Sequence, residues 1–430
     1  MCLGGNMKKV NGKSYLIIGL ILVIVGIFTL IGSVSLFKSV ANLVLIFMVL
    51  ISIKDLFSFI LKKPNKDMKL YMKILNVILS IIAFILSEYV IAIVPIIFSS
   101  YALLNAAINL LNFILIKIHK IKGWFGTLYL GLLYLFIGVI ILLGPLVHLD
   151  FVLFVLGIYA ILLGLSFVMD YLEINHYRKF FKIKITLPSL IEAFIPLSVL
   201  QKINKSINND EEIILETKKQ NIEPDLEIFI HVTEDGYGRL GHLDIYYDKK
   251  VMSFGNYDIY SYKLHEVIGN GIMFITENKE KYIDFCIEDN KKTLFSFGIK
   301  LTEEEKKKIE KNIEKITEHL KEWDPPCVQA KKKNKKYKKE EYMDYSSRLY
   351  RYTKAKFYKF KTGRYKFFSV IGNNCVSFAN KIIGSALKDK FKFYGVLTPG
   401  TYYDYLEREF LKKDSVVVSK KIYTKSSIKK

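Results

Sequence analysis

Apolar and polar positions divide the chain into two regions. In the first region, six apolar runs of about 17–25 residues are each long enough to cross a bilayer as a helix. These runs lie near residues 15–32, 38–61, 71–88, 90–116, 125–145 and 150–171. Lys54 and Asp55 interrupt the second run near one end. The pattern predicts an all-α membrane domain of six helices over residues 13–172, preceded by a cytoplasmic N-terminal segment, residues 1–12.

Three of the apolar segments are similar to one another and evenly spaced. "GLILVIVGI" begins at Gly19, "LNVILSIIA" at Leu75 and "GLLYLFIGV" at Gly131. A fixed period is typical of repeated structural units, so we expect three helical hairpins; chance similarity among apolar helices is the alternative. Gly19, Gly26, Gly131 and Gly138 would allow neighbouring helices to approach closely.

Lysine and arginine residues distinguish the two sides of the predicted helices. Basic clusters precede the first run, separate the second from the third and the fourth from the fifth, and follow the sixth. The opposite loops hold only four charged or titratable residues: Lys38, Glu88, His148 and Asp150. Because basic loops remain in the cytoplasm, the pattern predicts a multi-pass protein of the inner (plasma) membrane with both termini cytoplasmic.

This hairpin repeat, with its G-x6-G first helices and short outer turns, resembles the HdeD-type family of small bacterial six-helix membrane proteins over about residues 13–172. The resemblance implies an association with acid resistance and says little about mechanism. Asp55, Asn112 and Asp170 fall near the inner helix ends. Polar residues inside a membrane can mark a transport pathway, but so near the interface we expect them to meet headgroups and water.

The basic residues are concentrated beyond the apolar region. The formal net charge is +22, although 51% of the residues are hydrophobic. This separation is typical of a membrane region followed by a basic soluble region. Residues 173–221 would form a juxtamembrane segment and linker. Pro188 and Pro196 make the apolar part of this segment too broken to span, so it would lie along the inner membrane surface or pack under the soluble domain.

Strand and helix patterns alternate over residues 222–411, which predicts an α+β domain. We expect strands or hairpins at 226–235, 241–255, 271–278, 280–289, 292–301 and 355–370. Apolar residues at helical spacing predict a helix over 302–323, capped by Thr302. These residues are Ile309, Ile313, Ile316, Leu320 and Trp323. A last helix begins at Thr398, and residues 412–430 would be a basic tail.

A lysine-rich segment, residues 324–341, is predicted to be an exposed loop. Single-stranded nucleic acid would need aromatic side chains for stacking beside the charge, and only Tyr337 lies within the lysine run. We therefore expect no nucleic-acid partner. A loop that faces the anionic headgroups of the inner leaflet fits this composition better.

The chain has four cysteines, whose positions show no metal-binding spacing: Cys2, Cys286, Cys327 and Cys375. We expect no metal, no cofactor and no disulfide, which fits a reducing compartment. In "GNNCVSFANKIIG", Cys375 begins a short amphipathic helix that Asn373 or Asn374 would cap. The expected buried face comprises Val376, Phe378, Ala379, Ile382 and Ile383. A thiol at a helix N-terminus is more easily ionised; the alternative is an inert, buried cysteine.

A nucleophilic thiol needs a histidine that is near in space but not in sequence. Among the seven histidines, His242 is the strongest candidate, because it follows the glycine-rich "DGYGRLG" and begins a strand. His231 lies in the middle of a strand, where we expect a structural role. The others lie in or beside the membrane region, or lack a suitable context: His119, His148, His176, His265 and His319.

The order of "GH" opening a hairpin, "SFG" closing it, "NNC" on a helix and "LTPGTYYDYL" resembles the circularly permuted papain-like superfamily. This is the branch of the NlpC-type cysteine hydrolases that is related to lecithin–retinol acyltransferase. The resemblance covers about residues 222–411. It implies that Cys375 is the nucleophile and His242 the general base.

The family's third catalytic residue orients the imidazole, and the sequence leaves two candidates for it. Ser253 matches the family spacing. Asn256 is favoured by geometry, because a three-residue turn at 248–250 would place it opposite His242. Neither side chain accepts a hydrogen bond as strongly as Glu, which is often found at this place in the family.

These observations predict a membrane six-helix bundle of three hairpin repeats, joined to a cytoplasmic permuted papain-like domain. The expected activity is that of a thiol hydrolase or acyltransferase, which cleaves an amide or ester through a thioester on Cys375. The substrate would be a peptide, protein or lipid at the inner leaflet. One alternative is a catalytically inactive sensor or scaffold attached to an HdeD-like stress-response bundle. Another is a soluble regulator of a bundle that handles stress or protons.

Overall fold

The structure is a computed structural model. It describes residues 13–32, 34–61, 67–118, 124–176, 193–208, 216–218, 222–234, 239–333, 339–370, 372–384, 386–387, 398–412 and 414–424. The chain divides into two compact units, one of residues 18–115 and 123–165 and one built mainly from residues 166–430. The predicted N-terminal segment, and the glycine-rich stretch at 235–238, lie outside the described residues.

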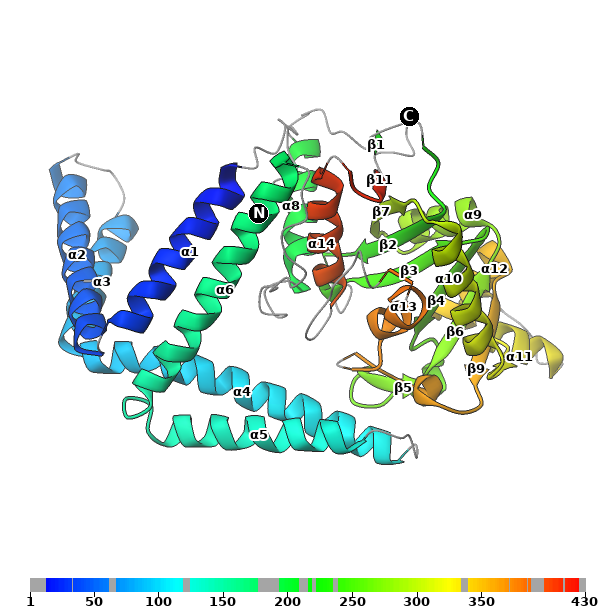
Figure 1. The fold of residues 1–430 in the computed structure, drawn as a ribbon, viewed down its shortest axis with the longest axis horizontal. Helices are drawn as coiled ribbons and strands as arrows, with labels where there is room; N and C mark the ends of the chain where they lie inside the picture. The colour runs from blue at the N-terminus through cyan, green and yellow to red at the C-terminus, as the bar shows by residue number, and fades with distance from the viewer. Residues whose placement is uncertain are drawn as a thin grey trace. The chain divides into compact units, whose positions relative to one another are not determined.

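The described N-terminal region is helical (Figure 1). Its helices are α1 (Lys13–Ile31), α2 (Val34–Leu61), α3 (Asp67–Ile85), α4 (Ser87–Ile118), α5 (Trp124–Leu143) and α6 (Leu149–His176). Five of these helices are long and apolar enough to cross a membrane, and α3 contributes a shorter apolar stretch, Leu70–Ile85. Apolar side chains such as Leu43, Phe57 and Phe136 are exposed, which suits surfaces that face lipid. The region is compatible with a multi-pass membrane protein.

Glycines allow two pairs of these helices to approach closely. A Cβ atom on Gly26 of α1 would lie 2.7 Å from the backbone oxygen of Gly157 on α6, and one on Gly164 would lie 2.6 Å from that of Gly19. The glycines of α5 meet leucine side chains of α4 in the same way: Gly131 against Leu110 and Gly138 against Leu103. The predicted close approach is therefore present. It joins α1 to α6 and α4 to α5, which belong to different predicted hairpins.

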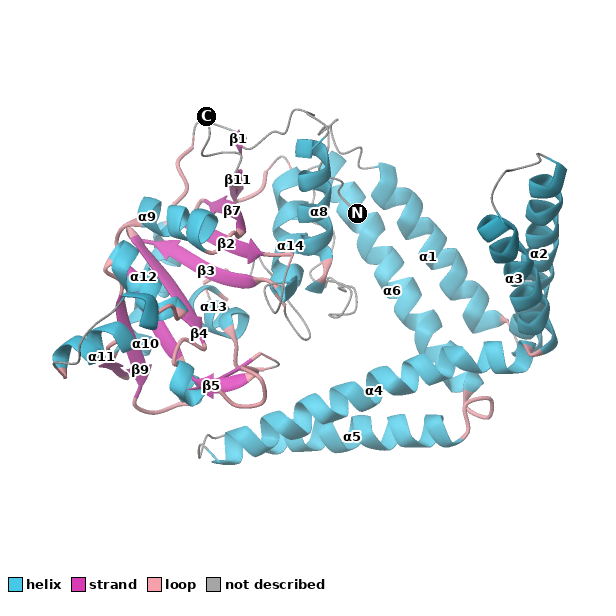
Figure 2. Ribbon diagram, turned by 180° about the vertical axis from the view of Figure 1, so that it is seen from behind, coloured by secondary structure: helices cyan, strands magenta, loops and turns pink. Residues whose placement is uncertain are grey.

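A nine-stranded antiparallel sheet forms the centre of the C-terminal domain, which is α+β as predicted (Figure 2). The strand order is β1-β11-β7-β2-β3-β4-β6-β9-β8. The strands are β1 (Glu216–Lys218), β2 (Leu226–Val232), β3 (His242–Tyr247), β4 (Lys250–Gly255), β6 (Ile272–Thr276), β7 (Thr293–Ile299), β8 (Leu320–Glu322), β9 (Lys356–Phe360) and β11 (Val417–Tyr423). Two further strands pair with each other: β5 (Ile268–Asn270) and β10 (Phe367–Ser369).

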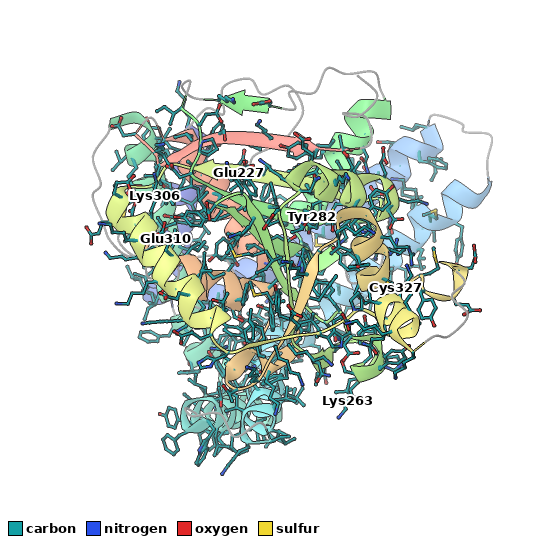
Figure 3. All side chains as sticks on the ribbon, turned by 90° about the vertical axis from the view of Figure 1, so that its right-hand side faces the viewer. Glu227, Lys263, Tyr282, Lys306, Glu310 and Cys327 are labelled. Atoms are coloured by element: carbon teal, nitrogen blue, oxygen red, sulfur yellow. The ribbon has the colours of Figure 1, made fainter. Side chains whose placement is uncertain are left out.

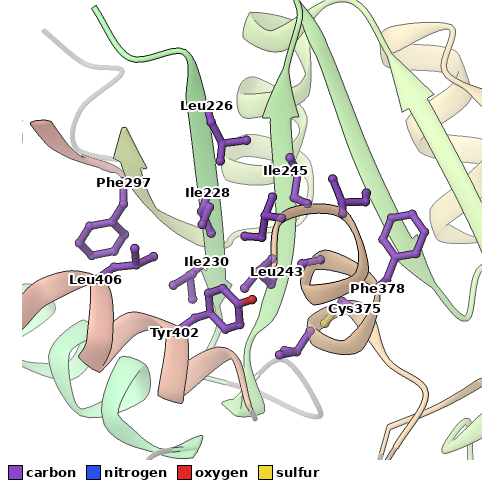
Figure 4. Packing of buried hydrophobic residues seen from close by; sticks show 14 of the residues in the cluster. Leu226, Ile228, Ile230, Leu243, Ile245, Phe297, Cys375, Phe378, Tyr402 and Leu406 are labelled. Atoms are coloured by element: carbon purple, nitrogen blue, oxygen red, sulfur yellow. The ribbon is translucent and has the colours of Figure 1, made fainter. Parts of the chain in front are cut away.

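Helices cover both faces of this sheet, because successive residues of a central strand point to opposite faces. On one face, Leu243 and Ile245 of β3 pack with apolar residues of four helices (Figure 4). These are α8 (Ile195–Asn208), α10 (Glu303–Thr317), α13 (Cys375–Ile383) and α14 (Pro399–Leu411). On the other face, Phe229 and Phe274 pack with α9 (Lys279–Asp284), the π-helical turn Phe285–Asp289 and α12 (Tyr345–Thr353).

The sheet extends beyond the range 222–411 that the sequence predicted for the domain. Strand β1 lies in the expected linker, and β11 lies in the expected basic tail. β11 pairs with β7 on one side and with β1 on the other. β1 is a three-residue edge strand, and β11 is an inner strand that is mostly buried although two of its seven residues are lysines. Neither segment has the apolar run or the regular alternation that predicts a strand from sequence.

Three predicted elements are also corrected. Residues 280–289 form α9 and the π-helical turn rather than a strand, and Tyr282 and Cys286 there are fully buried. The helix predicted over 302–323 ends at Thr317, and residues Leu320–Glu322 of the predicted range form strand β8 instead. The predicted loop at 324–341 begins with a helix, α11 (Pro326–Lys332).

The described part of the juxtamembrane segment packs on the domain. Val199, Leu200 and Ile203 of α8 are buried in the core that includes β2 and α14. Of the two placements predicted for this segment, packing under the soluble domain is therefore the one that applies to residues 195–208.

Acidic residues in the last turns of α6 pair with basic residues of α14 inside the second unit. Arg408 Nη1 donates to Asp170 Oδ2 at 2.8 Å, and Lys412 Nζ lies 2.5 Å from Glu173 Oε2. Asp170 is fully buried. It therefore meets a protein cation rather than the headgroups and water that its sequence position suggested.

Candidate functional site

Cys375 is the first residue of α13, as the sequence predicted. Asn374 caps the helix: its Oδ1 accepts from the backbone N–H of Ser377 at 3.0 Å, and its own N–H donates to Ser377 Oγ at 3.1 Å. This reciprocal pair is a capping box. Asn373 instead donates to the backbone oxygens of Arg364 and Phe367. The face predicted to be buried is buried.

The start of α13 can stabilise negative charge on or beside the sulfur. The first backbone N–H groups of a helix have no acceptor within it, and the helix dipole adds partial positive charge there. Those of Cys375 and Val376 are in this position. The Cys375 side chain is largely buried, with 5% of the residue exposed. A negatively charged sulfur would therefore be poorly hydrated, and would depend on these groups and on a nearby cation.

His242, the first residue of β3, supplies that cation. Its Nε2 atom lies 3.0 Å from Asp244 Oδ1, 2.9 Å from Ser253 Oγ and 3.1 Å from Tyr257 Oη. Because Nε2 is engaged by these oxygens, Nδ1 is the nitrogen left to exchange a proton with Cys375. The side chain is 22% exposed, so a substrate has partial access to the ring.

A gap in the strand pairing allows α13 to meet His242. β3 and β4 pair only from Tyr247–Lys250 to Ile245–Met252. Beyond that point β3 continues toward His242 beside β2, while β4 continues beside β6. α13 contacts both β3 and β4, and Figure 4 shows it beside the strand that carries Leu243 and Ile245. The site thus lies where the sheet divides.

The charges around His242 favour its protonated form. Burial alone would lower the pKa of His242, but attraction by the Cys375 thiolate and by Asp244 outweighs this and raises it to about 10. Hydrogen bonding to both side chains acts in the same direction. The imidazolium is therefore the expected form at neutral pH when Cys375 is a thiolate.

Asp244 is a site residue that sequence reasoning missed. It is 1% exposed and two residues after His242, so strand alternation places both side chains on one face of β3. Burial raises the pKa of a carboxyl, yet His242 and His231 hold the pKa of Asp244 well below its usual value. The spacing His-x-Asp on a strand was the signal that could have found it.

His231 and Tyr282 complete this polar cluster from behind. His231 Nε2 lies 2.6 Å from Asp244 Oδ2, and Tyr282 Oη donates to the same oxygen. Tyr282 comes from α9 and lies in the interior of the domain (Figure 3). His231, which the sequence assigned a structural role, is therefore joined to His242 through one shared carboxylate.

Ser253 and Asn256, the two sequence candidates for the third catalytic residue, lie in different surroundings, and only one of them is near His242. Ser253 lies beside His242, as the family spacing predicted, and its Oγ is also 2.7 Å from Tyr257 Oη. Asn256 does not: its Nδ2 donates to the backbone oxygen of Glu266 at 3.1 Å. The turn between β3 and β4 contains two residues, Asp248 and Lys249, both with positive φ. The expected three-residue turn was wrong, and the register it implied for Asn256 was wrong with it.

Within the described ranges, no group of three or more His, Cys, Asp or Glu residues is arranged to hold a metal ion. Comparison with protein-family models, with curated proteins and with solved structures finds no match. Evidence for the function of this protein therefore comes from the geometry of the site.

Proposed function

We propose that the protein is a membrane-anchored thiol hydrolase or acyltransferase, with Cys375 as nucleophile and His242 as general acid and base. The observation that carries the proposal is the packing of α13, which begins at Cys375, against β3, which begins at His242. A sulfur at the N-terminus of a capped helix interacts with an imidazole from a distant strand. Nucleophilic cysteines are activated in this way, by an adjacent imidazole and a helix N-terminus.

The reaction would proceed through a thioester. The Cys375 thiolate attacks the carbonyl carbon of an amide or ester, and the carbonyl oxygen becomes an oxyanion near the N–H groups that begin α13. The tetrahedral intermediate collapses, and the departing amine or alcohol takes a proton from His242. His242 then removes a proton from water, or from an acceptor amine or hydroxyl, which attacks the thioester and restores the thiolate–imidazolium pair.

The fold supports a permuted papain-like domain in two respects. The histidine strand precedes the cysteine helix in the chain, and the helix packs against the sheet that carries the histidine. For the N-terminal region we propose a six-helix bundle with HdeD-like hairpin repeats, for which the even spacing of Gly19, Leu75 and Gly131 is the support. The basic loops favour an inner-membrane orientation with both termini cytoplasmic. A peptide, protein or lipid amide or ester near the anionic inner leaflet is the proposed substrate.

Acylation by a chromogenic ester tests the proposal. The full-length protein in detergent micelles should release one equivalent of p-nitrophenolate from p-nitrophenyl acetate in a burst, and intact mass should increase by one acetyl group located on Cys375. Cys375→Ser and His242→Ala should abolish the burst. Cys327→Ser, which removes another buried thiol, should retain it.

The inactive sensor or scaffold predicts a different result. In that case the wild-type protein shows no burst, and acetylation, if it occurs at all, is distributed over Cys375 and Cys327 at similar slow rates. This outcome would refute the hydrolase proposal without affecting the fold.

A further inference from the structure

We propose that Asp244 is the positioning residue of this site, held as an anion by His231 and Tyr282 behind His242. The inference rests on the proposed thiol chemistry of Cys375 and His242. It assigns to the carboxylate the role that sequence reasoning gave to Ser253 or Asn256.

Each oxygen of the Asp244 carboxylate lies close to an imidazole nitrogen, and Oδ2 also accepts a hydrogen bond. Oδ1 faces His242 Nε2 at 3.0 Å, and Oδ2 faces His231 Nε2 at 2.6 Å while accepting from the Tyr282 hydroxyl. A carboxylate buried without such partners would take up a proton. These three contacts allow Asp244 to remain charged although its side chain is 0% exposed.

The hydroxyl groups beside His242 cannot replace this charge. Ser253 and Tyr257 also lie within hydrogen-bonding distance of Nε2, and they can fix the plane of the ring. A neutral hydroxyl adds only a dipole, however, whereas a buried imidazolium is stabilised most by a nearby full negative charge. The hydroxyl groups orient the imidazole ring, whereas Asp244 both orients the ring and stabilises its protonated form.

The other titratable groups that face this cluster do not supply a negative charge that could stabilise protonated His242 in place of Asp244. Burial raises the pKa of Tyr257, Tyr282 and Tyr345 well above its usual value and that of Cys286 to about 12. All four are therefore neutral at physiological pH. The nearby cation is Lys292, which lies over the Tyr345 ring. Among the described groups in contact with His242, Asp244 and the Cys375 thiolate are thus the anions.

His231 serves as a neutral support in this arrangement. Burial lowers the pKa of His231 to about 4, against the opposing attraction of Asp244. At neutral pH its Nε2 lies 2.6 Å from Oδ2 while the ring carries no positive charge of its own. A charged His231 would neutralise Asp244 and weaken the hold of the carboxylate on His242.

Two readouts on the full-length protein in micelles test the inference. Histidine labelled with carbon-13 at Cε1 reports the protonation of His242 by NMR as pH is varied, and His242→Gln assigns its signal. Alkylation of Cys375 by iodoacetamide at neutral pH, measured by peptide mapping, reports the thiolate. The test variants are Asp244→Asn and the milder Tyr282→Phe. Ser253→Ala and Tyr257→Phe are matched controls, because each removes a neutral partner of the same ring nitrogen.

The expected results differ between loss of the Asp244 charge and loss of a neutral hydroxyl beside His242. Asp244→Asn should let His242 lose its proton at least one pH unit lower, and Cys375 should be alkylated more slowly than in the wild type. Tyr282→Phe should shift both readouts in the same direction by less, and it keeps the test valid if Asp244→Asn does not fold. The two control variants should change His242 titration by only a few tenths of a unit.

Two results would overturn the inference, and they are distinguishable. If Cys375 is reactive and depends on His242, but Asp244→Asn and Tyr282→Phe shift neither readout more than the controls do, the inference alone is overturned. If wild-type Cys375 is alkylated no faster than Cys327, the thiol chemistry fails, and the inference fails with it.

Discussion

His231 and His242 lie opposite each other on β2 and β3, with ring centroids 5.9 Å apart, and both contact the carboxylate of Asp244. Their pKa values nevertheless move in opposite directions, to about 4 and about 10. One carboxylate stabilises one neighbouring imidazolium, because a second would repel the first. His242 also faces Cys375 and is partly exposed, so it is the one that carries the proton.

The neutral state of His231 predicts an acid-sensitive fold. A histidine whose pKa is lower in the folded than in the unfolded state binds its proton more weakly when folded. The free energy of unfolding should therefore decrease as pH falls from about 6.5 to about 4, by about 3 kcal/mol from this residue. Urea unfolding of the protein in micelles at several pH values measures this slope.

Matched variants isolate the contribution of His231 from that of the carboxyl groups. His231→Gln should have a shallower slope between these pH values, whatever its stability at neutral pH. His265→Asn, which replaces an exposed histidine, should retain the wild-type slope. Equal slopes for His231→Gln and the wild type would show that His231 does not remain neutral in the folded protein.

Gly241 sets the approach of the chain to His242. Its φ is +81°, and a Cβ there would lie 3.0 Å from Pro399 Cβ at the start of α14. Gly363 has a similar φ, +86°, with nothing within 4 Å of such a Cβ. Alanine at either position should cost about 1 kcal/mol from backbone strain. Only Gly241→Ala should also displace the start of β3 and slow the alkylation of Cys375 several-fold.

Thermal unfolding of the two glycine variants measures the cost of backbone strain. The alkylation rate of Cys375 measures whether the substitution at Gly241 also displaces His242. A Gly241→Ala protein that alkylates at the wild-type rate would mean that the chain before His242 does not hold the imidazole in place.

Close helix contacts in the membrane region predict a strong size limit at Gly164. A Cβ there would lie 2.6 Å from the backbone oxygen of Gly19, which cannot move aside as a flexible side chain can. Gly164→Leu should therefore separate α1 from α6 and destabilise the helical unit by about 1–3 kcal/mol. Gly126→Leu is the control, because nothing lies within 4 Å of a Cβ there.

Unfolding in increasing mole fractions of sodium dodecyl sulfate, followed by circular dichroism, measures the difference. Equal midpoints for the Gly164 and Gly126 variants would contradict the close packing of α1 on α6.

Local signals in the sequence predicted the place of Cys375 at the start of a capped helix, but not its full surroundings. The cap of α13 depends on residues within one turn of Cys375, so the motif "NNC" was sufficient to predict it. The turn after Tyr247 was misjudged because Asp248 and Lys249 adopt positive φ without the glycine or asparagine that usually announces such a turn. A shift of one residue in a hairpin moves each side chain to the other face, which is why Asn256 was misplaced.

The rest of the site arises from pairings between distant segments. The contact of His231 with Asp244 requires the register of β2 on β3, and Tyr282 reaches the cluster from a segment that resembled a strand. Neither the division of the sheet between β3 and β4 nor the incorporation of β11 leaves a periodic pattern. Such features follow from the packing of the whole domain rather than from local preference.

The pairing of Cys375 with His242 is tested most directly by the rate at which iodoacetamide modifies each cysteine at mildly acidic pH. In the wild-type protein, peptide mapping should find Cys375 modified at least about tenfold faster than Cys327, and His242→Ala should remove that advantage. Equal rates for the two cysteines, or a fast Cys375 that is indifferent to His242→Ala, would contradict the account.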